Sequence, residues 1–335
     1  MALRCLQILF LILVASTITF QAEACPKVGP PVSIVYAVGP YHREDRTRSI
    51  IDAQRLAENE RLTTPINHFL DAISELSDRI VDMRNRDSKY CYDGTLFKWA
   101  SADALLLTGE GAQPHYVQQW AAVTLGLARL KTGPLTAPDQ DRVVSSWMRK
   151  LARTVSRFHR GDGGPGRNNH YYWAMLGIGA IGLSTGDHEL WDRALAMDKI
   201  ALHDIRPDGT LQNELIRGNR ATRYHAAAAL PMAVLQLLRS DCWGKIYTAN
   251  EYGQEESRLH TLIDLIRGEV NGKKYIESIT RIKQLPISKQ HWLSLWDSVN
   301  IKQPQEASPK FSRSLAGSLS RLATVISSGC PLAPH

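Results

Sequence analysis

Apolar residues recur along most of this chain at steps of three and four positions, with charged residues between them. The pattern is clear in residues 139–158, where four-residue steps carry Val143, Trp147 and Leu151. Such spacing places the apolar side chains on one face of an α-helix. The alternating pattern that is typical of β-strands is nearly absent. Because each helix must bury its apolar face against other helices, the sequence predicts an all-α fold.

Connectors rich in glycine and proline divide the chain into about ten or more such helices. Within residues 45–84, Pro65 is expected to begin a second helix, since proline suits a first helical turn. A later helix is expected to run from about Asn213 or Arg220 to Leu238. Repeated helical hairpins must stack side by side or close into a ring. No strict repeat period is evident, so we favour a toroid over a solenoid, within one domain.

The first 24 residues have the features of a secretory signal. Arg4 precedes an apolar run over about residues 6–20, and Ala22-Glu23-Ala24 forms a cleavage site with small residues. The run is too short for a typical transmembrane helix. A lipoprotein anchor on Cys25 is less favoured, because no leucine stands three residues before it. We therefore predict that residues 1–24 are removed and that the protein is exported, most simply to the periplasm, with secretion as the alternative.

The mature chain, residues 25–335, forms the single predicted domain and keeps an even number of cysteines, namely Cys25, Cys91, Cys242 and Cys330. An even count in an exported protein suggests two disulfides, for which three connectivities are open. We favour Cys25–Cys91 with Cys242–Cys330, since each bond would fasten one terminus to the body. Reduced, partly buried thiols are the alternative. None of these cysteines is closely spaced with another, so a metal site is not expected.

The charge balance narrows the choice of partner. Lysine and arginine number 40 against 33 acidic residues, which gives a formal charge of +7. This modest excess favours an acidic partner. No basic run with interleaved aromatics, zinc motif or helix-turn-helix pattern points to nucleic acid, and no later stretch could span a membrane. An acidic polysaccharide is also compatible with the net positive charge. Nothing indicates a subunit interface, so a monomer is expected.

Two short stretches, Arg167–Trp173 and Asn213–His225, concentrate polar and aromatic side chains beside apolar helical segments. Protein cores rarely gather such groups, because every buried polar atom needs a partner. Together the stretches predict a pocket for an anionic, hydroxyl-rich ligand. If the second stretch is helical throughout, Arg217 and Tyr224 are seven residues apart and share one face. A guanidinium there could hold a carboxylate with two hydrogen bonds and depress the pKa of the phenol.

Each of these residues also has a purely structural interpretation. A lone His170 is more often a hydrogen-bonded structural histidine, Tyr224 a core tyrosine and Trp120 a core tryptophan. The charged loop around Tyr41 is either a solvated surface loop or a flap over a cleft. Only the coincidence of these residues favours a functional site. A glycoside hydrolase would need two carboxylates, for which the candidates are Asp162, Glu214 and Asp103, none within a distinctive motif. The motifs of other common hydrolases and nucleotide-binding proteins are absent.

Three runs carry a joint motif, Asn168-Asn169-His170-x-Tyr172-Trp173, Asp208-Gly209-x-Leu211-x-Asn213-Glu214-Leu215-x-Arg217 and Arg220-Ala221-x-x-Tyr224-His225. With this motif the sequence resembles the alginate lyase family, the mannuronate-cleaving lyases of polysaccharide lyase family 5. The resemblance implies an incomplete (α/α) toroid with a deep cleft. It also implies β-elimination of 1,4-linked β-D-mannuronate, giving 4,5-unsaturated uronate ends, with no metal and no other cofactor.

The matching positions imply a catalytic group made of Asn169, His170, Arg217 and Tyr224. Substrate contacts are expected from Tyr41, Arg220, Trp173, Trp120 and His225. The flap residues Tyr41-His42-Arg43-Glu44-Asp45 match the family poorly. Tyr224 is the expected acid, and also the base if its pKa is lowered; His170 is the competing candidate for the base. A lyase for another polyuronate such as glucuronan, or a non-catalytic periplasmic polyuronate-binding protein, remains the alternative.

Overall fold

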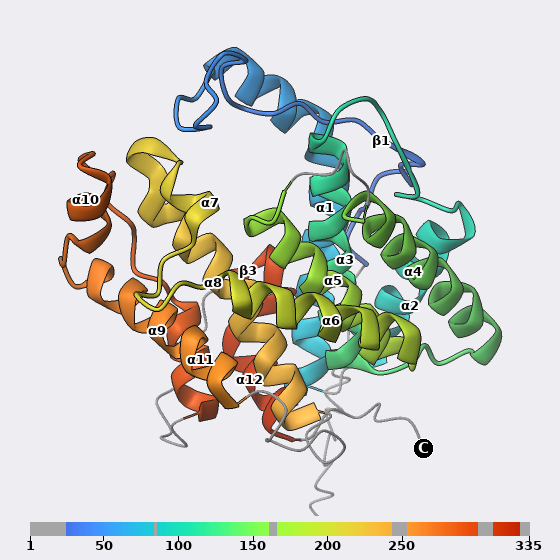
Figure 1. Ribbon diagram of the computed structural model, residues 1–335. Helices are drawn as coiled ribbons and strands as arrows, with labels where there is room; N and C mark the ends of the chain where they lie inside the picture. Colours follow the sequence, from blue (N-terminus) through green and yellow to red (C-terminus); the bar gives the residue numbers. More distant parts are fainter. Residues whose placement is uncertain (1–24, 84–85, 161–165, 243–252, 301–310, 329–335) are drawn as a thin grey trace, which may run out of the picture.

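The computed structural model describes residues 25–83, 86–160, 166–242, 253–300 and 311–328 (Figure 1). The helices of the first half are α1 (Ala53–Met83), α2 (Arg86–Ser101), α3 (Gln113–Thr132), α4 (Pro138–Phe158), α5 (Asn169–Thr185) and α6 (His188–Asp204). Those of the second half are α7 (Gln212–Leu215), η1 (Gly218–Arg220), α8 (Ala221–Leu237), η2 (Leu238–Cys242), α9 (Gly253–Val270), α10 (Tyr275–Thr280), α11 (Trp292–Asn300), η4 (Arg313–Leu315) and α12 (Leu319–Ser327).

The strands are short and pair only in twos. Strand β1 (Ile34–Val35) runs parallel to β2 (Leu107–Thr108), and β3 (Phe311–Ser312) runs antiparallel to β4 (Gly317–Ser318). The first pair fastens the N-terminal segment beside the start of α3, and the second lies against α1. The predicted all-α fold is therefore confirmed for the described residues.

The helices form an inner and an outer layer. The inner row is α1, α3, α5 and α8, in which each helix packs against the next (Figure 1). The helix that follows each of them along the chain, α2, α4, α6 and α9, packs on its outer side and completes a hairpin. The C-terminal helices α11 and α12 bridge from α8 to α1 and α3 in place of a further hairpin. This arrangement is the predicted incomplete (α/α) toroid.

The sequences of the two layers explain their positions. Helix α5 is apolar on all sides and nearly all of its residues are buried, which suits the inner row. Helix α4 is strongly amphipathic and buries only the stripe that includes Trp147 and Leu151. Inner helices also approach closely: a Cβ on Gly126 of α3 would lie 2.7 Å from the Cβ of Ala180 on α5. Glycine is therefore required at this crossing.

The structure corrects the prediction that Pro65 begins a second helix. Pro65 lies inside α1, which continues through it to Met83. The hydroxyl groups of Thr63 and Thr64 donate to the carbonyl groups of Asn59 and Glu60 at 2.8 and 2.6 Å. These bonds hold the turn that precedes Pro65, whose missing N–H leaves the carbonyl group of Arg61 without its helical donor.

The predicted helix toward Leu238 begins at Ala221, close to the later of its two expected starts. Helix α7 and the 3₁₀ turn η1 precede it as separate elements. Gly218, the first residue of η1, has a φ of 55°, a left-handed conformation that interrupts helical continuity after α7. Arg217 therefore lies in a turn, and the expectation that it shares a helix face with Tyr224 is wrong.

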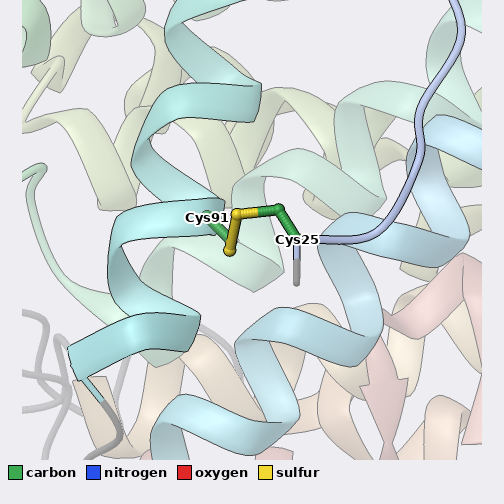
Figure 2. Close-up of a disulfide and its surroundings, with 2 residues drawn as sticks. All are labelled: Cys25 and Cys91. Carbon is green, nitrogen blue, oxygen red and sulfur yellow. A yellow bond between two sulfur atoms is a disulfide. The ribbon is translucent and has the colours of Figure 1, made fainter. Parts of the chain in front are cut away.

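One of the two favoured disulfides is present. Cys25 is bonded to Cys91 of α2, with Cα atoms 5.3 Å apart (Figure 2). The bond ties the first described residue to the outer layer, as predicted. The pairing of Cys242 with Cys330 and the signal sequence, residues 1–24, lie outside what the structure describes. None of the described helices combines the length and apolarity needed to cross a bilayer.

Candidate active site

A cavity of about 350 Å³ opens where the loop before α1 meets the N-termini of α3 and α5 and the turn before α8. Of the predicted residues, Tyr41, His170, Arg217 and Tyr224 line it. Its charged side chains are mostly basic, with Arg48, Arg55 and Arg217 against Glu110. A cavity with this charge attracts a polyanion.

Asn169 lies directly behind the cavity wall, at the first residue of α5. The preceding Asn168 caps this helix, because its side chain accepts a hydrogen bond from the backbone N–H of His170 at 2.9 Å. The backbone N–H and the Nδ2 of Asn169 both donate to Oε1 of the buried Glu214, at 2.6 and 3.2 Å. One hydrogen on Nδ2 remains for a ligand.

Glu214 joins the two polar stretches of the sequence. Its other oxygen, Oε2, accepts from Nε of Arg217 at 3.2 Å. Burial raises the pKa of Glu214, and the charge of Arg217 and the donors of Asn169 oppose that rise. One fully buried carboxylate thus holds the amide and the guanidinium side by side.

The His170 ring is held flat against Tyr116 of α3, with ring centroids 3.5 Å apart and planes 6° apart. Burial lowers the pKa of His170 to about 3, and the nearby charge of Arg217 adds to the effect. The imidazole is therefore neutral at neutral pH. A neutral imidazole carries one hydrogen, so its tautomer decides what it can do.

A hydrogen-bond chain sets that tautomer. Nε2 of His159 lies 2.9 Å from Oε1 of Gln119, and Nε2 of Gln119 lies 3.2 Å from Nδ1 of His170. With the amide in this orientation, Gln119 donates to Nδ1 of His170, so that nitrogen has no hydrogen. The hydrogen must then be on Nε2. His170 is a donor from that nitrogen, which does not suit it to act as a base.

Tyr224 reaches the cavity from the first turns of α8. Its hydroxyl group donates to the hydroxyl of Tyr41 at 2.7 Å, and the carbonyl oxygen of Arg48 lies 3.2 Å away. The guanidinium carbon of Arg217 is 4.8 Å from the centroid of the Tyr224 ring. Arg217 alone would depress the pKa of this phenol, but burial and the Tyr41 hydroxyl outweigh it and the pKa is raised. The predicted depression is wrong for the unliganded protein, in which Tyr224 is protonated.

The loop over residues 40–51 closes on Tyr224 from outside, as expected of a flap. Tyr41 pairs with Ile51 in a single antiparallel bridge at the base of the loop. Arg220 does not line the cavity; its guanidinium carbon lies 5.9 Å from the centroid of the Tyr41 ring. Arg220 can therefore orient Tyr41 without itself reaching the cavity.

The structure does not bring the remaining predicted contacts to the cavity wall. Trp120 lies beside His170, with ring centroids 5.9 Å apart, and packs partly into the core. Trp173 is buried. His225 has no exposed surface: its Nε2 accepts from the N–H of Leu211 at 2.9 Å and its Nδ1 donates to the carbonyl of Ala221 at 2.8 Å. Direct substrate contact by His225 is excluded by this burial.

The carboxylates considered for a hydrolase do not form a pair. Glu214 is bonded to Asn169 and Arg217, whereas Asp103 lines a different cavity and lies 2.9 Å from Nζ of Lys150. Asp162 lies outside the described residues. In the described ranges, no three histidine, cysteine or acidic side chains gather as metal ligands would.

Sequence reasoning missed several residues of the site, namely Arg48, Arg55, Tyr116, Gln119 and His159. A usable signal existed on α3, because Gln118 and Gln119 directly precede an apolar run of this helix and both are fully buried. A polar residue in such a position needs a partner from elsewhere. No comparable signal distinguishes Arg48 and Arg55 from the other arginines near the charged loop.

Comparison with known sequences gives consistent matches. The sequence model of the alginate lyase family matches residues 40–272, more than half of the chain. A polysaccharide lyase of Stenotrophomonas maltophilia is 29% identical over 326 residues, covering 93% of this chain and 94% of that protein. An alginate lyase of Azotobacter vinelandii is 29% identical over 223 residues, covering 64% of this chain but only 59% of that protein.

Solved structures support the same fold. Alginate lyase A1-III from Sphingomonas species A1 superposes with a TM-score of 0.68 at 21% identity, covering 90% of this chain and 86% of that one. Two variants of alginate lyase A1-III complexed with a tetrasaccharide superpose with TM-scores of 0.69 and 0.70. At this identity the likeness concerns the architecture of the helices.

Proposed function

The chain belongs to the alginate lyase family, and from that premise we propose that it cleaves the 1,4-linked β-D-mannuronate chains of alginate by β-elimination. The observation that carries this proposal is the convergence of Arg217, the His170 donor and the Tyr224 hydroxyl on one basic cavity. Donors and a proton-transfer group are the two parts that the reaction requires. The relatives whose names specify alginate lyase support the choice of polymer.

The first requirement is to neutralise the uronate carboxylate. The C5 proton is weakly acidic while that group is charged, and its removal adds negative charge to the same oxygens. Fixed donors aimed at this charge stabilise the transition state more than the ground state. In our proposal the carboxylate is bound by Arg217 and by Nε2–H of His170. Asn169 contributes its free amide hydrogen, and Glu214 fixes the positions of Asn169 and Arg217.

The second requirement is proton transfer. In our proposal the C5–H bond breaks and its electrons form the C4–C5 double bond, while the C4–O4 bond breaks. Tyr224 gives its hydroxyl proton to O4 and takes the proton from C5, so the phenol is regenerated. The raised pKa of Tyr224 favours the protonated starting state. A base role for His170 is disfavoured, because the hydrogen-bond chain leaves its hydrogen on Nε2.

The stereochemistry of the sugar supports mannuronate. In β-mannuronate the C5 proton and O4 lie on the same side of the ring, so one phenol can serve both. β-Glucuronate shares this arrangement, and a glucuronan lyase is therefore the second candidate. The loop that carries Tyr41 is the element we propose to distinguish the two, since it covers the cavity.

A set of polymers tests the proposal. The purified protein is incubated with polymannuronate, polyguluronate and glucuronan, with and without a chelator, while absorbance of the C4–C5 double bond is followed. We expect absorbance to rise with polymannuronate at a rate unaffected by the chelator. New reducing ends without absorbance would indicate a hydrolase, and binding without either would indicate the non-catalytic alternative. A rate that the chelator abolishes would contradict a reaction without metal.

We further propose that residues 1–24 direct export and are removed, leaving residues 25–335 as one monomeric domain. The disulfide between Cys25 and Cys91 supports this, because such bonds persist in oxidising compartments outside the cytoplasm. Mass spectrometry of the protein from the periplasmic fraction should give a mature N-terminus at Cys25. An intact N-terminus on an exported protein would contradict the cleavage.

A further inference from the structure

A second, smaller cavity of about 160 Å³ lies between the C-terminal end of α4 and the start of α6. Its polar lining consists of Ser156, one carboxylate, that of Glu189, and four arginines, Arg153, Arg157, Arg160 and Arg193. It shares no lining residue with the catalytic cavity.

The positive charge of this arginine cavity is only partly balanced. Arg153 is paired with Asp187 at 2.9 Å and with Glu189 at 3.7 Å. Nη2 of Arg157 donates to the hydroxyl group of Thr154 at 2.9 Å. Among the residues that the structure describes, Arg160 and Arg193 form no ion pair. Burial lowers the pKa of Arg193, and the charge of Arg160 lowers it further. Two like charges held near each other are unfavourable unless an anion lies between them.

Unpartnered polar atoms gather at the same place. Ser156 is 4% exposed and lines the arginine cavity, yet its Oγ has no hydrogen-bond partner in the described part of the chain. The buried Nε of Arg193 also lacks a partner in the described residues. His159 lies nearby: burial lowers its pKa to about 4, and the charge of Arg193 adds to the effect. Buried polar atoms are normally paired, so their grouping here indicates a missing ligand.

We propose that the arginine cavity is an oxyanion site that holds a carboxylate group of a uronate chain outside the catalytic cavity. Guanidinium groups bind carboxylates with paired, charge-assisted hydrogen bonds, and the Ser156 hydroxyl supplies one more donor. The small volume suits a single anionic group better than several sugar residues. The oxyanion site does not depend on lyase chemistry; only the choice of a uronate as its occupant rests on the proposed function. A free inorganic anion such as sulfate is the other source of the same chemistry.

The test uses protein whose histidines are isotope-labelled and which carries Tyr224→Phe to block turnover. A mannuronate trisaccharide and sodium sulfate are titrated separately at constant ionic strength, and the NMR signals of His159 and His170 are followed. The His170 signal reports the catalytic cavity. His159 lies near Arg193 but is also joined to His170 through Gln119, so only the part of its shift that depends on Arg160 and Arg193 reports the arginine cavity. We expect the trisaccharide to shift the His159 signal saturably, and sulfate to compete for that shift. The double change Arg160→Gln with Arg193→Gln should weaken this binding about tenfold or more.

The control is Arg142→Gln, which removes one charge from α4 outside the arginine cavity and should leave the titration unchanged. Thermal unfolding tests whether the double variant still folds. In chloride buffer the double variant should unfold at the same or a higher temperature, since it removes charge repulsion, and sulfate should no longer stabilise it. Saturable binding of sulfate alone would reject a uronate occupant. A His159 signal that neither ligand shifts, or that shifts equally in the double variant, would overturn the site. These outcomes can be interpreted even if the wild type has no lyase activity, because they measure binding and unfolding and not turnover.

Discussion

At the scale of single residues, neighbours determine what each side chain of the site can do. His170 is a neutral donor because it is buried and because Gln119 occupies its Nδ1. Tyr224 is protonated because burial and Tyr41 outweigh Arg217. Residue types alone do not decide these states: the sequence leaves His170 open as a base, whereas its contacts favour the donor role.

Gln119→Glu should change the protonation of His170. A carboxylate accepts from both histidines, so Nδ1 of His170 must carry a hydrogen and its pKa must rise. The Nε2–H donor then persists only below the raised pKa and is lost as the pH increases through it. We expect a pH profile of kcat/KM in which activity falls on the alkaline side, and a matching change in the ¹⁵N shifts of His170. In the wild type, kcat/KM should not fall in this way between about pH 5 and 8, because the pKa of His170 is about 3.

The control for this variant is Gln140→Glu on α4, which adds the same charge without touching either histidine. It should keep the wild-type pH profile. An unchanged profile in Gln119→Glu, with an intact fold, would mean that the hydrogen-bond chain does not set the state of His170.

At the scale of elements, the loop over residues 40–51 is ordered by one side chain. The carboxylate of Asp45 accepts from the backbone N–H groups of Thr47, Ser49 and Ile50 at 2.9, 2.6 and 2.7 Å. The hydroxyl of Thr47 donates to it as well, at 2.5 Å. Burial would raise the pKa of Asp45, but these hydrogen bonds together outweigh that effect and lower the pKa to about 2. The loop should therefore stay ordered throughout the neutral and mildly acidic range.

Asp45→Ala should loosen this loop without unfolding the protein. Four acceptor contacts are lost, so Tyr41 is no longer held over the cavity and KM should rise about threefold to tenfold. The melting temperature should change little, because the loop lies outside the core. Steady-state kinetics and thermal unfolding measure the two effects. Asp139→Ala, an exposed change on α4, is the control; equal KM values in the two variants would contradict the role of Asp45.

The elements also show where sequence patterns suffice. Amphipathic spacing predicts α4, because it alternates charged residues with an apolar stripe throughout its length. The same reasoning misplaces a helix start at Pro65, because threonine hydroxyls stabilise the turn that the proline disturbs. The start of α8 depends on the left-handed Gly218, on which an added Cβ would lie 3.3 Å from Oγ of Ser49 in the flap. That packing joins segments far apart in the sequence. Hydrophobic periodicity within one segment does not predict such contacts.

At the scale of the whole molecule, the toroid brings the two polar stretches to one end of the inner layer. The motif with Asn169, His170, Arg217 and Tyr224 made this grouping predictable through resemblance. In the structure, His170, Arg217 and Tyr224 line one cavity, and the buried Glu214 joins Arg217 to Asn169. Residues that join the site from other hairpins, such as Gln119 and His159, could not be predicted. Their roles depend on which helices become neighbours in the ring.

Buried histidines should make the whole fold sensitive to acid. Burial lowers the pKa of His225 to about 4, below the 6.5 of an unfolded histidine, so the unfolded chain binds more protons between these values. The stability contributed by neutral His225 is therefore complete above about pH 6.5 and falls as the pH decreases. Between pH 7 and 5 the wild type should lose about 2 kcal/mol from this residue alone.

His225→Asn isolates that contribution, because other titrating groups are common to both proteins. Urea unfolding at the two pH values should show the variant less stable at pH 7, with the difference from wild type smaller by about 2 kcal/mol at pH 5. A difference that does not depend on pH would contradict a neutral, buried His225.

The account as a whole depends on the hydroxyl group of Tyr224 transferring the proton within a cavity that binds the uronate by other groups. Tyr224→Phe tests this most directly, through single-turnover formation of the C4–C5 double bond together with binding of a mannuronate oligomer. We predict that the rate falls by about 100-fold to 10,000-fold while the dissociation constant changes by less than about threefold. Near-normal double-bond formation by the folded variant would contradict the mechanism.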